Sequence, residues 1–184
     1  MKIVYEYSHL GGVEIMQVRH PQMWDQVRQV ITSVEARRLK ISKEKTMLGR
    51  ALVDPKDMNI QFKTGFETLG FHQLIDKYNI QLEGRKEVIR GCYKQIDFSK
   101  DKVLVEVQFG KYAFMFYDMA KFQYFYNENK ADVGIEIVPC HSLYKSMSSG
   151  VSYGEQLIND IERLKRHFPA VPVAVLLIDE NTID

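Results

Sequence analysis

The sequence predicts an α/β fold, in which one domain is built on a mixed central β-sheet flanked by helices. The chain has 184 residues, enough for one domain to bury a core without disulfides or a structural metal. Hydrophobic residues make up 45% and charged residues 27%, which disfavours disordered, collagen-like and membrane proteins. The hydrophobic period changes between helical and strand-like along the chain. We therefore expect residues 1–184 to form one α/β domain.

The first half of the chain predicts helices separated by a polar loop. An amphipathic helix is expected from Pro21, in the segment PQMWDQVRQVITSVEARRL, because proline suits a first helical turn and apolar residues recur at helical spacing. A second helix is expected over residues 59–69, with a loop over 42–50 between the two. The apolar face of the first helix comprises Trp24, Val27, Val30, Ile31 and Val34.

Apolar residues then recur at every second position, which predicts a β-hairpin. Apolar and polar residues alternate over 103–109, directly after the turn-prone residues 99–102. Later segments predict a helix over 112–126, a strand over 133–138, a helix over 152–168 and a strand over 171–178. A hairpin followed by strand, helix, strand, helix and strand predicts a mixed sheet with right-handed crossovers in its later half.

Charge and cysteine usage narrow the class of protein. The net charge of +1 does not by itself indicate a nucleic-acid partner, although carboxylates that hold a cation would offset lysines that meet phosphate. The chain has no apolar run of the roughly 18 residues that span a bilayer. Cys92 and Cys140 lie in no metal-binding motif, and the sequence begins without a secretion signal. We expect a cytoplasmic protein with reduced thiols and no membrane contact.

Three polar residues of the hairpin form a candidate catalytic centre. Glu106 and Gln108 are two apart on a strand and share a face, and Asp97 on the preceding strand can converge on them. Carboxylates, joined by the backbone carbonyl of Val107, are oxygen ligands for Mg²⁺, which helps generate hydroxide and neutralises charge on a phosphate. Gln108 can orient water or phosphate but is no base. The alternative, a solvated hairpin face, is the more frequent meaning of such a pattern alone.

The surrounding sequence favours a catalytic centre over a solvated hairpin face. The string IDFSKDKVLVEVQFGKYAFMFYDM resembles the catalytic core of type II restriction endonucleases of the BglII/BstYI family, which belongs to the PD-(D/E)xK superfamily. The similarity to BstYI looks greater than that to BglII. The shared features are an acidic residue before Phe, a charged turn, and Glu-Val-Gln-Phe where the superfamily usually has Glu-x-Lys. The segments IVYEYSHLGGVE, SKEKTMLGRAL, DVGIEIVPCHSLYKSMSSGVSY and FPAVPVAVLLI look similar in the same order. The resemblance implies a restriction-endonuclease-like core with Asp97 and Glu106 as metal ligands. Gln108 then replaces the usual lysine, which argues against a lysine base and favours a metal-bound hydroxide as nucleophile.

The resemblance also implies a substrate and partners. Enzymes of this family bind palindromic double-stranded DNA as two-fold homodimers, and helices 112–126 and 152–168 are then expected at the dimer contact, with ordinary core packing as the alternative. The implied site has a GATC core, as in RGATCY or an AGATCT-like sequence, and cleavage leaves four-base 5′ overhangs. A cognate DNA methyltransferase is the expected functional companion.

Residues that would contact DNA follow from the same resemblance. Lys111 matches a loop that enters the major groove, where lysine can donate to guanine, while a surface lysine or phosphate contact is the alternative. A second recognition loop is expected at residues 148–152, which would otherwise cap a helix with Ser152 as N-cap. Tyr153 is expected at a phosphate or an interface. Ser148 and Ser149 are the remaining candidates in that loop. Apart from the resemblance, Lys100, Lys102 and Lys121 are candidates for phosphate contacts because of their charge, with a solvated surface position as the alternative.

Two rival functions remain open from the sequence. A structure-specific or repair nuclease of the same superfamily would share the Asp97 and Glu106 pair without reading a palindrome. A non-catalytic DNA-binding protein on this fold would follow if the missing lysine meant an inactive centre.

Overall fold

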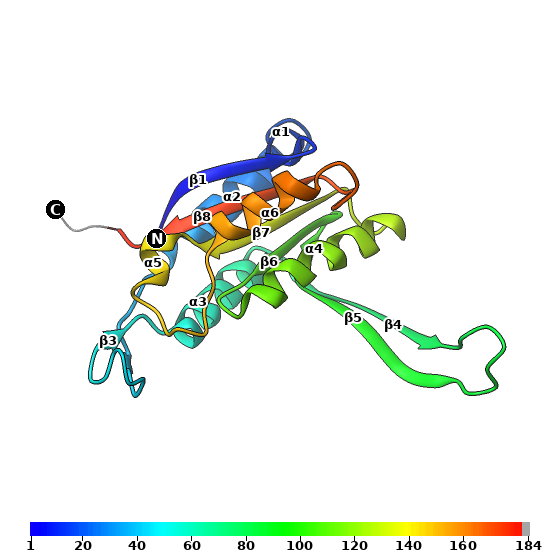
Figure 1. Ribbon diagram of the computed structural model, residues 1–184. Helices are drawn as coiled ribbons and strands as arrows, with labels where there is room; N and C mark the ends of the chain where they lie inside the picture. The colour runs from blue at the N-terminus through cyan, green and yellow to red at the C-terminus, as the bar shows by residue number, and fades with distance from the viewer. Residues whose placement is uncertain (182–184) are drawn as a thin grey trace.

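The computed structural model describes residues 1–181 and is built around a six-stranded mixed sheet, in the order β1-β8-β7-β6-β5-β4 (Figure 1). The last three residues of the expected 1–184 domain lie outside the described part. Strands β6, β7 and β8 are parallel, whereas β1, β4 and β5 run antiparallel to their neighbours. The strands are β1 Lys2–His9, β4 His72–Ile80, β5 Ile89–Lys100, β6 Val103–Val107, β7 Val133–Pro139 and β8 Val173–Asp179, with a separate ribbon of β2 Lys40–Ile41 and β3 Ala51–Leu52.

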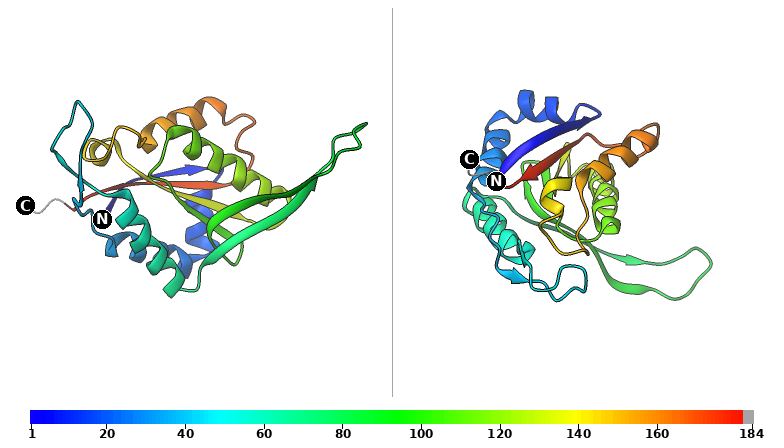
Figure 2. Two further views of the ribbon diagram at one scale, coloured as in Figure 1. Left: turned by 90° about the horizontal axis from the view of Figure 1, so that it is seen from below. Right: turned by 60° about the vertical axis from the view of Figure 1, so that its left-hand side comes forward.

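Helices cover both faces of the sheet. Figure 2 shows α4 and α6 on one face and α2 and α3 on the other. All five residues of β6 and all seven of β7 are buried, as expected of parallel strands that helices cover on both sides. This three-layer arrangement confirms the predicted α/β class. The helices are α1 Gly12–Arg19, α2 Pro21–Ser33, α3 Pro55–Thr68, α4 Tyr112–Asn127, α5 His141–Tyr144 and α6 Gly154–Leu164.

Several helix boundaries differ from the sequence predictions, including the end of the last helix, which is Leu164 and not residue 168. The helix beginning at Pro21 is confirmed but ends at Ser33, and the helix expected over 59–69 already begins at Pro55. The last helix begins at Gly154, so the prediction of Ser152 as its N-cap is wrong. Tyr153 is the N-cap residue, and its side chain makes no capping hydrogen bond. None of the helices in the described chain combines the length and apolar character needed to cross a bilayer.

Strands β4 and β5 form a long hairpin that projects from the body of the molecule (Figure 1). Their pairing begins at His72 and Ser99, inside the sheet, and continues to Ile80 and Ile89 near the tip. Most side chains of β4 are exposed or only partly buried. The hairpin matters for the site because Asp97 lies on β5 at the point where the projecting part joins the sheet.

Candidate active site

Strand pairing brings the two predicted carboxylates together. Phe98 is the partner of Val105 in the β5–β6 ladder, so the next residues outward, Asp97 and Glu106, lie side by side. Asp97 is partly buried, whereas Glu106 is only 2% exposed. The alternative of a solvated hairpin face is therefore wrong for Glu106. A carboxylate buried this deeply needs a counter-charge or a proton.

Helix α4 supplies the counter-charge. The Nζ atom of Lys121 lies 2.6 Å from Oε1 of Glu106 and 2.7 Å from Oδ1 of Asp118. The Nε2 atom of Gln108 donates a hydrogen bond to Oδ2 of Asp118 at 3.0 Å. These contacts join Glu106, Lys121, Asp118 and Gln108 into a continuous chain. Lys121 was expected at a DNA phosphate, but the structure places its ammonium among buried carboxylates.

A further carboxylate lies behind this chain. Glu136 is the partner of Glu106 in the parallel β6–β7 ladder and is fully buried. Neither of its carboxylate oxygens has a hydrogen-bond partner among the described residues. No motif in the sequence pointed to Glu136 or Asp118, although a carboxylate inside the apolar run of β7 is an unusual feature that could have signalled the cluster.

Burial and mutual repulsion control protonation in this cluster. Desolvation, followed by the charges of Asp118 and Asp97, raises the pKa of Glu106 to about 9, although Lys121 acts in the opposite direction. Desolvation also raises the pKa of Glu136 well above its ordinary value, and that of Asp118. Burial alone would lower the pKa of Lys121, but the Glu106 and Asp118 carboxylates raise it. The cluster therefore retains protons at neutral pH that an entering cation would displace.

A cavity of about 280 Å³ opens beside the carboxylate pair. Asp97 and Val107 line it, while the buried Glu106 does not. Among residues 1–181, no three His, Cys, Asp or Glu side chains are arranged as a ready metal cage. The donors predicted from the sequence are two carboxylates and a backbone carbonyl, an all-oxygen set of the kind that suits Mg²⁺, which usually retains several waters. The other lining residues are Asn59, Phe62, Lys63, Glu67, Gln73 and Phe98.

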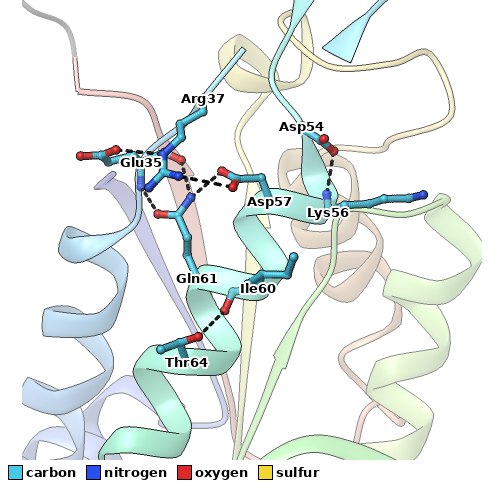
Figure 3. Close-up of polar contacts among 8 residues, drawn as sticks. All are labelled: Glu35, Arg37, Asp54, Lys56, Asp57, Ile60, Gln61 and Thr64. Carbon is cyan, nitrogen blue, oxygen red and sulfur yellow. Dashed lines mark hydrogen bonds and ion pairs between the residues drawn. The ribbon is translucent and has the colours of Figure 1, made fainter. Parts of the chain in front are cut away.

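One wall of this cavity is helix α3, whose first turns are anchored by polar contacts (Figure 3). Asp54 is its N-cap and accepts a hydrogen bond from the Lys56 backbone N–H at 2.9 Å. Oε1 of Gln61 accepts from the Glu35 backbone N–H at 2.9 Å, and its amide donates to Asp57 at 2.7 Å. These contacts tie α3 to the segment that follows α2, which fixes the position of the cavity wall.

The two expected recognition loops lie next to one another. Lys111 is exposed at the N-cap of α4. The N–H of Ser152 donates to the carbonyl of Gly110 at 2.9 Å, which joins the second loop to the first. The Ser152 side chain is largely buried, with 7% of the residue exposed. Lys111 is thus presented to solvent, whereas Ser152 serves mainly to connect the loops.

Two lysines that no sequence pattern indicated, Lys40 and Lys56, flank the second loop. Nζ of Lys40 donates to Oγ of Ser148 at 2.5 Å, and the Ser149 N–H donates to Glu44 at 3.3 Å. Lys40 and Lys56 line a cavity of about 440 Å³ together with Ser148. Only the tertiary structure brings these lysines to the loop, because they lie about a hundred residues earlier in the chain.

Three other predicted contacts are engaged within the protein. Nζ of Lys100 donates to the Leu69 carbonyl at 2.8 Å and to Gln26 at 3.2 Å. Nζ of Lys102 donates to Oδ1 of Asn129 at 3.1 Å. The ring of Tyr153 packs edge-on against His141, with centroids 4.8 Å apart, and tilted against Tyr144 at 5.2 Å. The structure brings none of these three residues into contact with the carboxylate cluster.

Known proteins resemble this chain over almost its whole length. The family model described as restriction endonuclease BglII/BglIII matches residues 4–178. The type II restriction enzyme BglII of Bacillus subtilis is 26% identical over 177 residues, covering 91% of this chain and 71% of that protein. The crystal structure of BglII complexed with a DNA 16-mer has a TM-score of 0.74 at 24% identity, covering 100% of this chain and 79% of that one. That of free BglII has a TM-score of 0.67 at 21% identity, with coverages of 100% and 82%.

Proposed function

The chain belongs to the restriction endonuclease BglII/BglIII family and is a type II restriction enzyme, and we propose that it hydrolyses phosphodiester bonds of double-stranded DNA with Mg²⁺ held by Asp97 and Glu106. The observation that carries this assignment is the pairing of these two carboxylates at the β5–β6 junction, beside a cavity lined by Asp97 and Val107. In a family of DNA-cutting enzymes, such a pair is suited to holding a hard cation against a phosphate.

The ligands in this proposal are the Asp97 and Glu106 carboxylates and the backbone carbonyl of Val107. Bound Mg²⁺ supplies a Lewis acid that lowers the pKa of a water and neutralises charge on the phosphate. Gln108 has no basic nitrogen, so it does not take a proton from water. Its amide oxygen accepts from the Gly110 N–H at 2.9 Å and its amide nitrogen donates to Asp118, so it fixes the end of β6 and the start of the Lys111 loop.

We propose a palindromic substrate with a GATC core, either RGATCY or AGATCT-like, cut to leave four-base 5′ overhangs. We further propose that the chain is more similar to BstYI than to BglII; the resemblance of its sequence to both enzymes supports this site. Lys111 is the proposed base-reading residue, and the hydrogen bond from Ser152 to Gly110 places the Ser148 and Ser149 loop beside it. Lys100 and Tyr153 are weaker candidates for DNA contacts because their side chains make contacts within the protein.

A homodimer fits a palindromic substrate, and we propose that α4 and α6 contribute its interface. The two helices pack together on one face of the sheet, and the Tyr112 hydroxyl donates a hydrogen bond to Asp160 between them. Phe114 and Tyr117 of α4 are 55% and 47% exposed, so apolar surface remains for a partner. A cytoplasmic location, one domain over residues 1–184 and a cognate DNA methyltransferase complete the proposal.

Cleavage of unmethylated phage DNA tests this function. The purified protein is incubated with Mg²⁺ or with EDTA, and the ends of the fragments are sequenced. Discrete Mg²⁺-dependent ends within GATC-centred palindromes are expected and would give the flanking bases. Random ends would instead indicate a repair-type nuclease, and an absence of cleavage would indicate a non-catalytic DNA-binding protein.

A further inference from the structure

We propose that Lys121 takes the place of the lysine that the Glu106-x-Gln108 motif lacks, holding Glu106 in position for the metal from helix α4. This inference rests on the proposed function, because it concerns the same metal site. It makes Lys121 a positioning residue, which acts through the carboxylate that it binds.

The contacts of Lys121 are directed inward. Its Nζ atom lies within 2.7 Å of both Glu106 and Asp118, while only 14% of its side chain is exposed. Asp118 lies three residues earlier on the same helix, so both side chains project from one face of α4 toward β6. Two short charged contacts on one ammonium fix the Glu106 carboxylate more firmly than a mobile surface lysine would.

The charge around Glu106 explains why a cation is required there. Glu106, Asp118 and Glu136 are at most 2% exposed, and Asp97 lies beside Glu106. Within residues 1–181, Lys121 is the cation that contacts this group. A buried carboxylate that loses its ion-pair partner must take up a proton or move, so loss of Lys121 would disturb the placement of Glu106.

A shared contact links Lys121 to the missing motif lysine. Gln108 occupies the motif position, and its amide bonds to Oδ2 of Asp118 at 3.0 Å. Lys121 bonds to the other oxygen, Oδ1, of the same carboxylate at 2.7 Å. Position 108, directly after β6, and position 121 on α4 therefore reach the same point of the cluster. A lysine contributed by α4 can supply the positive charge that the strand does not.

Ca²⁺ affinity of the whole protein, measured by calorimetry without DNA, tests this role. Lys121→Gln should weaken Ca²⁺ binding by about 10- to 100-fold, the usual effect of removing a group that orients a metal ligand. The matched control is Lys130→Gln, which removes a lysine from an exposed pair with Asp76 and should leave Ca²⁺ affinity unchanged. Ca²⁺ affinity of Lys121→Gln equal to or tighter than that of the wild type would overturn the inference.

A relocated lysine provides the second test and covers the case in which Lys121→Gln does not fold. The double variant Gln108→Lys with Lys121→Gln should recover folding, judged by its thermal melt, and most of the lost Ca²⁺ affinity. Failure of this variant to recover either property would refute the idea that Lys121 stands in for the motif lysine. Wild-type protein that neither binds Ca²⁺ nor cuts DNA would refute the proposed function itself, whereas wild-type activity with an unaffected Lys121→Gln variant would refute only this inference.

Discussion

Binding of a divalent cation should displace a proton from Glu106. Burial, followed by the charges of Asp118 and Asp97, raises the pKa of this residue to about 9 and so favours its protonated form at neutral pH, whereas a metal ligand must be ionised. Below that pKa, each pH unit changes the free energy of binding by about 1.4 kcal/mol for one proton. Affinity for Ca²⁺ should therefore rise roughly 100-fold, or about 2.7 kcal/mol, between about pH 6.5 and about pH 8.5.

The same shift gives the metal-free protein a defined pH dependence of stability. Because the folded pKa of Glu106 is raised above its ordinary value of 4.5, the folded protein keeps a proton that the unfolded chain loses. The contribution of Glu106 to the free energy of unfolding should then be greatest below about pH 4.5 and fall as the pH rises toward 9. Glu136 contributes in the same direction.

Isothermal titration calorimetry in two buffers of different ionisation enthalpy measures the protons released. About one proton per bound Ca²⁺ is expected near neutral pH, and the Glu106→Gln variant should release fewer. An affinity that is flat with pH, with no proton released by the wild type, would refute the assignment of Glu106 as a protonated metal ligand.

Three further changes test other parts of the account. Gly134→Ala would place a Cβ atom 2.6 Å from Cγ of Phe122, so overpacking should cost about 1–3 kcal/mol of stability in a denaturant melt, whereas Gly150→Ala, with nothing within 4 Å, should cost little. Lys111→Ala should weaken or relax recognition by about 1–3 kcal/mol if it meets a base edge, and unchanged preference in a selection from random duplexes would make it a phosphate contact. Glu136→Gln should flatten the loss of stability at alkaline pH, and an unchanged melting profile from about pH 6 to pH 9 would count against a buried protonated Glu136.

The buried parts of the fold could be predicted because a helix or strand that packs on a core repeats its apolar residues at a regular spacing. Strands β6, β7 and β8 and the helices α2, α4 and α6 all carried apolar patterns that matched their observed positions. The β4–β5 hairpin lacked such a signal, since most side chains of its projecting part are exposed or only partly buried and its sequence does not alternate regularly between apolar and polar residues. The N-cap of α6 was misplaced because Ser152 looked like a capping residue, but its backbone N–H bonds to the Gly110 carbonyl of another loop.

The candidate site was predictable only where it depends on local pairing. Asp97 and Glu106 are nine residues apart across one hairpin, so their proximity follows from its register. Asp118 and Lys121 reach Glu106 only because α4 folds back over β6, which no local pattern specifies. Lys121 consequently looked like one of several solvated lysines, and its burial among carboxylates could be found only from the tertiary structure.

The most direct test of the central claim compares the wild type with Asp97→Asn on a GATC-centred DNA duplex in Mg²⁺. Both cleavage under single-turnover conditions and binding in the presence of Ca²⁺ are measured. Loss of an oxygen ligand's charge should abolish cutting by Asp97→Asn while its affinity for the duplex remains close to that of the wild type. Cleavage by Asp97→Asn at the wild-type rate would remove Asp97 from the metal site and contradict the account.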